Sequence, residues 1–251
     1  MNRTVKIVLL TVVGVPVALI AAVLVWFGTV AIANSYKWGW TEVPVRYRLT
    51  FGVEVGGVAY TGSTVVEVTY EQIPAWQNLI GPGIAALYHG QAGLLRLPDG
   101  KMVCLMPRGE YVVFGKENYS APAIADRLLS VNGSLTGPKQ KWTPILASNA
   151  ATVAGNADIP IELLPPMIVL DDSANPSSAH LFDPEHPERT LGSGARFLGA
   201  QIAVTDAPVS HDIEAVLPWL ANPAIPQMLN RPSDAFLQEN HRTPLFKAYF
   251  Y

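Results

Sequence analysis

One uninterrupted apolar segment, Ile7–Ala33, constrains this chain more than any other feature, because it contains no Asp, Glu, Lys or Arg. An α-helix rises about 1.5 Å per residue, so roughly 20 apolar residues cross the ~30 Å hydrocarbon core of a bilayer. In lipid, a single segment can satisfy its backbone amides only as a helix. The segment therefore predicts one membrane-spanning helix, which Pro16 is expected to kink.

The residues that flank this segment predict its orientation. Arg3 and Lys6 precede it and the large polar part of the chain follows it. We therefore expect a cytoplasmic N-terminus, a helix in the bacterial inner membrane and the bulk of the chain in the periplasm. Because Trp and Tyr favour the membrane–water interface, we expect an interfacial aromatic belt at the outer end of the helix, made of Trp26, Tyr36, Trp38 and Trp40.

A cleaved signal peptide is the alternative to a permanent anchor. Ala31-Ile32-Ala33 has the small-x-small form of a cleavage site. The apolar segment is much longer than the roughly 7–15 residues of an ordinary signal core, which favours the anchor. Both interpretations export the rest of the chain.

Small residues recur at every fourth position of the expected helix, at Gly14, Ala18 and Ala22. They would share one face, and such faces let two helices approach closely. This pattern predicts a contact with a second copy of the chain or with another membrane protein. The alternative is the general abundance of Gly and Ala in spanning helices.

Composition supports a β-rich exported domain. The 21 Pro and 20 Gly are scattered, which favours a loop-rich β architecture over a helical bundle. The net charge of −3 gives no basic excess for nucleic acid. Cys104 is the single cysteine, so no internal disulfide can form, and its apolar surroundings predict that it is buried. We divide the chain into an anchor (1–36), an aromatic linker (37–44) and an extracytoplasmic β-rich domain (45–251).

The clearest local pattern is a β-hairpin at the start of that domain. Apolar and polar residues alternate along Val45–Val55, as in a strand with one buried face. Gly56-Gly57 then supplies the positive φ angles of a two-residue turn. The returning strand, Val58–Tyr70, is rich in β-branched residues.

Weaker patterns complete the expected fold, which is mainly β (α+β): one antiparallel-sheet domain with two or three short helices. A second hairpin is expected around Pro98-Asp99-Gly100, a typical turn sequence. Gln72–His89 and Asp171–Ser193 are expected to be irregular, the first with one helical turn. Further strands are expected at Tyr111–Phe114, Met167–Leu170, Arg196–Thr205 (with Leu198, Ala200, Ile202 and Val204 on one face) and Leu245–Tyr251, and helices at Ala121–Leu129 (ended by Asn132-Gly133), His211–Leu217 (capped by Ser210) and Asp234–Gln238.

Two pairs of segments suggest a relationship. Tyr47–Thr50 and Tyr60–Val68 lie near the start of the domain, and Ile202–Val209 and Leu217–Leu220 lie towards its end. They resemble the opening hairpin and the closing segment of a group of uncharacterised bacterial single-span membrane-anchored proteins. The resemblance implies one exported domain that includes both ends, and it transfers no catalytic residue.

The strongest candidates for metal ligands are His180, Asp183 and His186, because imidazole and carboxylate groups bind metal ions. Pro184 and Pro187 stiffen this segment and its spacing matches no metal motif, so a solvated loop is the alternative. The chain has no G-x-S-x-G elbow, P-loop or dinucleotide fingerprint. We expect no catalytic residue and no cofactor.

Two further tryptophans, Trp76 and Trp142, lie in Pro- and Gly-flanked loops and form a candidate partner surface. Together these features predict a non-enzymatic, membrane-anchored accessory or scaffold protein that binds another envelope protein or membrane complex, or itself. Two alternatives stay open. One is a metal-dependent or His/Asp-based hydrolase of the cell envelope, and the other is a membrane-anchored immunity protein against a secreted toxin.

Overall fold

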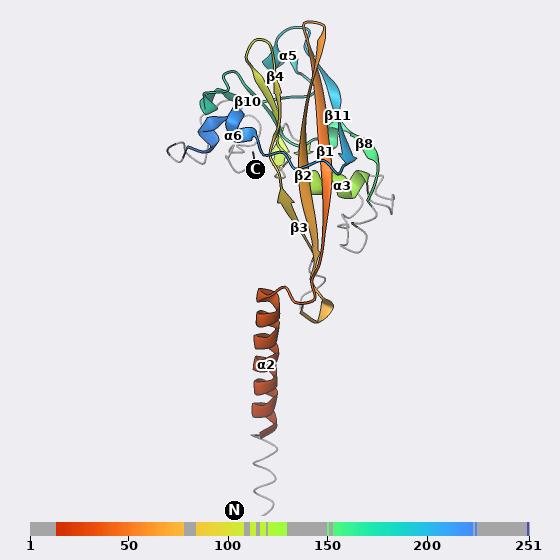
Figure 1. Cartoon of the computed structure of the whole chain (residues 1–251), viewed down its shortest axis with the longest axis vertical. Coiled ribbons are helices and arrows are strands. Elements are labelled where there is room, and N and C mark those ends of the chain that lie inside the picture. Colours follow the sequence, from red (N-terminus) through yellow and green to blue (C-terminus); the bar gives the residue numbers. More distant parts are fainter. Residues whose placement is uncertain are drawn as a thin grey trace, which may run out of the picture.

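A long hairpin of β1 (Thr41–Val55) and β2 (Val58–Gln72) is the central element of the computed structural model (Figure 1). Gly56 and Gly57 turn the chain with φ angles of 61° and 79°, as a tight two-residue turn requires. The predicted hairpin is confirmed. It is also longer than expected, because residues 41–44 pair with residues 69–72 and so belong to β1 rather than to a linker.

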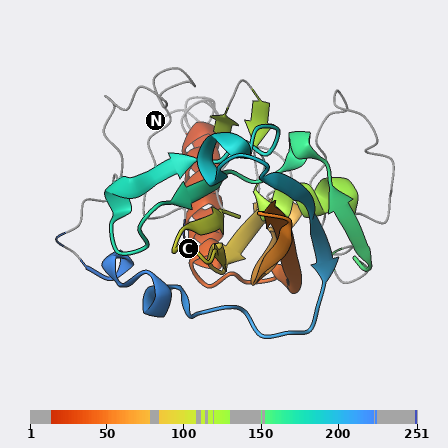
Figure 2. The ribbon, with the colours of Figure 1, turned by 90° about the horizontal axis from the view of Figure 1, so that it is seen from above.

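The hairpin is part of one large antiparallel sheet. The structure describes residues 14–77, 84–107, 111–113, 116–118, 120–129, 150, 153–222, 224 and 250. In these ranges the sheet has nine strands: eight run in the order β10-β9-β5-β4-β2-β1-β11-β8, and the ninth, β3, pairs with β2. The strands form an arc when viewed from above (Figure 2). The other members are β3 (Ile84–His89), β4 (Gly93–Arg96), β5 (Met102–Leu105), β8 (Asn156–Ile159), β9 (Met167–Leu170), β10 (Ala179–Leu181) and β11 (Arg196–Val204), with β6 (Tyr111–Val113) and β7 (Lys116–Asn118) as a separate pair.

The helices are few and mostly short, so the expected mainly β class is confirmed. The exception is α2 (Val15–Ser35), which extends away from the sheet (Figure 1). It is long and apolar enough to cross a bilayer, a property that signal sequences share. The other helices of the described ranges are α3 (Ala121–Leu128), α5 (Glu188–Leu191) and α6 (Ile213–Val216), with the 3-10 turns η2 (Ala75–Gln77), η3 (Ile161–Leu163), η4 (Pro176–Ser178) and η5 (Pro218–Leu220).

The main core lies on the inner face of the arc. Tyr47, Leu49 and Phe51 of β1 are each at most 1% exposed. They belong to the same cluster as Ile124 and Ala125 of α3. Successive side chains of a strand point to opposite faces. Alternate residues of β1 therefore point to the same face and join the cluster that contains α3.

A second core covers the outer face of β5 and β9. Alternate residues of β5 divide between the two clusters: Val103 and Leu105 point to the main core, and Met102 and Cys104 to the second. This explains why short strands here are apolar at every position. The cover includes Trp219 and Phe250, whose ring centroids are 5.5 Å apart.

Two expected loops contain strands. The prediction that Gln72–His89 is irregular is wrong, because this segment contains β3, which pairs with Glu67–Gln72 of β2. β3 bonds to the backbone N–H and C=O groups on the edge of β2 that faces away from β1. The helical turn expected there is present as η2. Asp171–Ser193 is also wrong as a loop, because β10 pairs with β9 and carries two buried side chains among polar neighbours.

A β-bulge changes the expected face of β11. Strict alternation places Leu198 with the buried residues of that strand, but the structure leaves it 48% exposed on the outer face. Gly52 of β1 pairs with Gly199, whereas Val53 pairs with Phe197. Leu198 is therefore the extra residue of a bulge.

Ser210 does not cap the C-terminal helix, which is a further correction. It bonds to β2 instead: its hydroxyl accepts from the Val65 amide at 3.0 Å, and its own amide donates to the Val65 carbonyl at 3.0 Å. Asp212 takes the N-cap position of α6. The first helical amide, from Ile213, donates to the side chain of Gln91 at 2.9 Å.

Other expectations lie outside the described residues. Phe250 is the described member of the expected C-terminal strand, and its buried ring and its carbonyl, which accepts from Ala92 at 2.8 Å, confirm that the chain end docks on the domain. The expectations outside the described residues are the segment before Gly14, the helix end at Asn132-Gly133, Trp142, the helix Asp234–Gln238 and the strand pairing of Leu245–Tyr251. Pro16 is described and lies in the first turn of α2, where proline is compatible with a helix. The kink expected at Pro16 also involves the residues before Gly14, so it stays a prediction.

Candidate functional site

Hydrogen bonds and ion pairs join α2 to the sheet at a junction around Lys37 and Gln77. The helix ends in a Schellman motif, in which the Trp38 amide donates to the Ala33 carbonyl at 2.9 Å and the Lys37 amide donates to Asn34 at 3.1 Å. Lys37 occupies the left-handed position, with φ 48°, where glycine is usual. A non-glycine residue there costs about 1–2 kcal/mol, so other contacts must hold it.

Those contacts are two ion pairs. The Lys37 ammonium lies 2.5 Å from a carboxylate oxygen of Glu71 and 3.0 Å from one of Glu42. The hydrogen bond to Glu71, followed by that to Glu42, raises the pKa of Lys37 above its ordinary 10.5. Glu42 and Glu71 face each other in the register of the hairpin, where like charges are destabilising. Lys37 neutralises this repulsion and connects the helix to the base of both long strands.

The buried amide of Gln77 connects a third element to the junction. It accepts from the Trp40 indole N–H at 2.8 Å and donates to the Trp38 carbonyl at 2.6 Å. Gln77 belongs to η2, between β2 and β3. The helix end, the hairpin base and this turn are therefore joined by specific bonds. Val30 and Ala33 are the buried residues of α2.

Tyr36, Trp38 and Trp40 of the expected aromatic belt lie at this junction, whereas Trp26 lies further back along α2. Tyr36 and Trp38 are 80% and 68% exposed, whereas Trp40 is partly buried by its bond to Gln77. Trp26 lies on α2 and is 44% exposed. The small residues of the helix are also exposed, at Gly14, Ala18 and Ala22.

Trp76, expected on a partner surface, lies at the same junction. It is 40% exposed, and its ring meets that of Trp38 edge to face, with centroids 5.7 Å apart. Sequence reasoning placed Trp76 in a separate loop, because the pairing of η2 with the helix end is a long-range contact.

The candidate metal ligands do not converge. His180 bonds to Asp171 at 3.0 Å, Asp183 lies 3.6 Å from Arg189, and His186 lies 3.4 Å from Glu188. Among the described residues, no three His, Cys, Asp or Glu side chains are grouped so that they could hold a metal ion. The His180–Asp171 pair has the geometry of a base with an orienting acid, but it is exposed on the strand edge.

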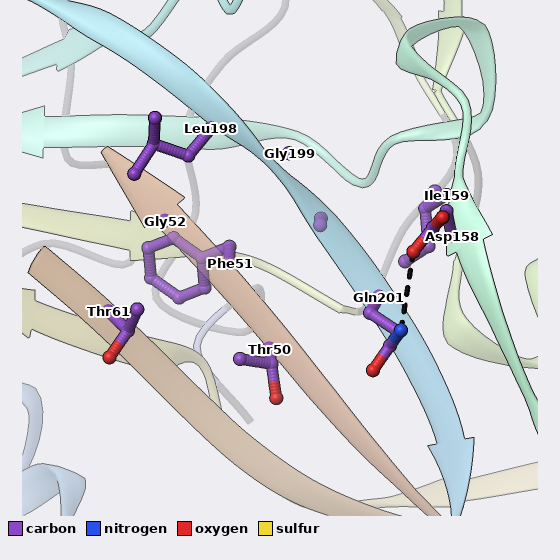
Figure 3. Close-up of a pocket in the computed structure, with 10 residues that line it drawn as sticks. Thr50, Phe51, Gly52, Thr61, Asp158, Ile159, Leu198, Gly199 and Gln201 are labelled. Atoms are coloured by element: carbon purple, nitrogen blue, oxygen red, sulfur yellow. Dashed lines mark hydrogen bonds between the residues drawn. The ribbon is translucent and has the colours of Figure 1, made fainter. Parts of the chain in front are cut away.

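A cavity of about 500 Å³ opens on the outer face of the sheet, between β1, β11 and β8 (Figure 3). Gly52 and Gly199 are among its lining residues, and a Cβ at Gly199 would have no neighbouring atom within 4 Å. Its polar lining includes Thr50 and Gln201, and the Gln201 amide donates to Asp158 at 3.2 Å. No His, Cys or Lys is among its lining residues. The cavity can offer hydrogen bonds, but its lining supplies no base for a threonine hydroxyl other than Asp158.

Among the described residues, the titratable groups whose pKa values are shifted most lie inside the two cores. The hydroxyls of Tyr47 and Tyr70 share a buried hydrogen bond of 2.9 Å. Burial raises the pKa of both phenols above their ordinary 10, and the charge of Asp126 adds to the effect. Burial likewise raises the pKa of the Cys104 thiol, which is fully buried as expected. These groups are neutral and sealed from solvent, as in a structural role.

Comparisons with protein-family models, with curated proteins and with solved structures found no match to this chain, so its relationship to the group named above stays a prediction.

Proposed function

We propose that this protein is a non-enzymatic, membrane-anchored scaffold of the cell envelope, which presents its β-domain to another envelope protein or membrane complex. The observation that supports this role is the bonded junction at Lys37. An apolar helix that could span a bilayer joins the sheet through ion pairs and amide bonds rather than through a flexible linker.

A bonded junction of this kind would hold the β-domain in one orientation for a partner in the same membrane. A flexible linker would let the domain sample many orientations, whereas the Schellman turn and the Gln77 bridge leave few free torsions between helix and sheet. A partner in the same membrane then meets one surface at one height, which reduces the entropy lost on binding.

Co-purification from mild detergent tests this proposal. The full-length chain is tagged at its C-terminus, purified natively and examined by mass spectrometry for co-eluting proteins. We expect a membrane or envelope protein, or a second copy of the chain. A control variant carries a Gly-Ser insertion after Trp38, which keeps anchor and domain but frees the junction, and we expect it to retain less partner. A lone monomer in both detergent and nanodiscs would overturn the scaffold role.

The same preparation tests topology. The intact mass of the purified chain distinguishes an anchor, which keeps residues 1–33, from a cleaved signal peptide. A C-terminal alkaline phosphatase fusion should be active, because that enzyme requires an oxidising compartment for its disulfides. A fusion active only as a cytoplasmic reporter would refute export of the domain.

The small-residue face of α2 can be examined separately. Ala18→Leu places a bulky side chain on that face, whereas Ala31→Leu lies about 140° away around the helix at roughly 100° per residue. If copies associate through the face, Ala18→Leu should weaken the dimer and Ala31→Leu should not. If the two substitutions have the same effect on the dimer, the small-residue face is not the contact, and partners would bind through the β-domain.

A further inference from the structure

The turn η2 lies beside the end of α2, although it is separated from α2 in the chain by the whole β1–β2 hairpin. Figure 1 shows this turn at the lower end of the sheet, next to the upper end of the helix. Gln77 bonds to Trp38 and Trp40, and Trp76 meets the Trp38 ring at 5.7 Å. A bilayer that surrounded α2 would therefore end near this turn.

The tryptophans at the junction divide into two kinds. Trp40 is held by Gln77 and lies 5.3 Å from the Lys37 ammonium. Trp38 and Trp76, in contrast, are 68% and 40% exposed although both rings are large and apolar. Exposed Trp rings next to an apolar helix are typical of a membrane–water interface, where an amphipathic ring lies at headgroup level.

Continuity with α2 favours lipid over a protein as the occupant of this surface. Exposed apolar side chains continue along the helix to Ile32, which is 64% exposed one turn before Tyr36. The local charge does not favour an anionic surface, because one cation, Lys37, faces two carboxylates, Glu42 and Glu71. Contact with lipid would then depend on the rings and not on anionic headgroups.

We propose that Trp76 makes a second membrane contact, paired with Trp38, so that the domain rests on the lipid headgroups at two points from distant parts of the chain. This inference rests on the proposed anchoring role of α2. The junction restrains the domain relative to α2, but helix and domain can still tilt together relative to the bilayer. A second contact beside the helix axis would limit that tilt. The lipid surface thus orients the same domain that the scaffold presents.

Quenching of tryptophan fluorescence by brominated acyl chains tests the contact. The full-length chain is reconstituted in phosphatidylcholine vesicles with and without brominated lipid, and the quenched intensity is the difference between the two emissions. Trp76→Phe should lower the quenched intensity by an amount comparable to Trp38→Phe. Trp219→Phe is the matched control, since Trp219 is 5% exposed in the second core and should contribute no quenched intensity.

The outcomes separate this inference from the proposed function. Trp26→Phe reports on α2 itself, and its loss of quenched intensity shows that the helix is in lipid. If Trp26→Phe lowers the quenched intensity and Trp76→Phe does not, the anchor stands and the second contact is refuted. If neither does, both proposals fail. Trp76→Tyr keeps the amphipathic ring, so it repeats the measurement if Trp76→Phe does not fold.

Discussion

The ring of Phe51 occupies space that two glycines leave open, which makes Gly62 a sharp test of the packing. Gly62 pairs with Phe51 across the hairpin. A Cβ at Gly62 would lie 2.8 Å from the carbonyl oxygen of Leu94, 2.9 Å from Cβ of Leu95 and 2.9 Å from Cζ of Phe51. Gly93 also leaves room for this ring, because a Cβ there would lie 3.0 Å from Cε1 of Phe51.

We predict that Gly62→Ala destabilises the domain by about 1–2 kcal/mol. Overpacking a filled core costs roughly 1–3 kcal/mol, and replacing Gly by Ala in a strand returns about 0.5–1 kcal/mol of backbone entropy. The Leu94 oxygen belongs to the backbone, so the clash cannot be relieved by a side-chain rotation. For a domain of this size, 1 kcal/mol corresponds to roughly 2–4 °C, so the melting temperature should fall by about 2–8 °C.

The assay is thermal unfolding of the full-length chain in detergent, followed by tryptophan emission. Gly52→Ala is the matched control, because Gly52 lies beside Phe51 on the outer face and its Cβ would meet atoms at an ordinary 3.4 Å. It should be neutral or slightly stabilising. Adding Phe51→Leu should reduce the further cost of Gly62→Ala, since it removes one of the three close contacts. Equal melting temperatures for Gly62→Ala and Gly52→Ala would refute the packing argument.

Two further predictions concern buried groups. Since burial raises the pKa of Tyr47 and Tyr70 above 10, each phenol stays protonated in the folded chain while it ionises in the unfolded chain. The contribution of these two phenols to stability should therefore be constant below pH 10 and fall above it by up to about 1.4 kcal/mol per pH unit and tyrosine; a double Phe variant that keeps the full decline in alkaline denaturation would contradict this. Cys104 is 0% exposed, so a water-soluble maleimide should label it only after unfolding, and rapid labelling of the folded chain, read by mass spectrometry, would show that the second core is open.

The long hairpin could be predicted because its signals are local. The Gly56-Gly57 turn fixes the register, and the alternation of β1 then assigns every side chain to a face. The strand at Met167–Leu170 could also be predicted, from its run of four apolar residues, although the sequence could not show which core each residue joins. That division depends on which segments cover the outer face, a property of the whole fold.

The expectations that failed depend on long-range partners. Ser210 has the sequence context of a helix cap, but it bonds to the backbone of Val65 instead. Its hydroxyl accepts from the Val65 amide and its amide donates to the Val65 carbonyl. Leu198 fits an alternating pattern until the bulge opposite Gly52 shifts the register. β10 has three residues, too few for periodicity to distinguish it from a loop.

The junction, in contrast, contains a signal that sequence reasoning could have used. A two-residue turn at Gly56-Gly57 places Glu42 opposite Glu71, and two facing carboxylates repel each other, which favours a cation nearby. Lys37, at the end of the apolar segment, is the nearest basic residue before Glu42. The register of the hairpin is thus a reason to expect that the helix end contacts the strand base. Residues 37–40 form a bonded junction, and residues 41–44 belong to β1. A role in which the domain moves freely relative to the helix would require the ion pairs of Lys37 with Glu42 and Glu71 to break. The proposed role, in which the domain presents a fixed surface, keeps these ion pairs.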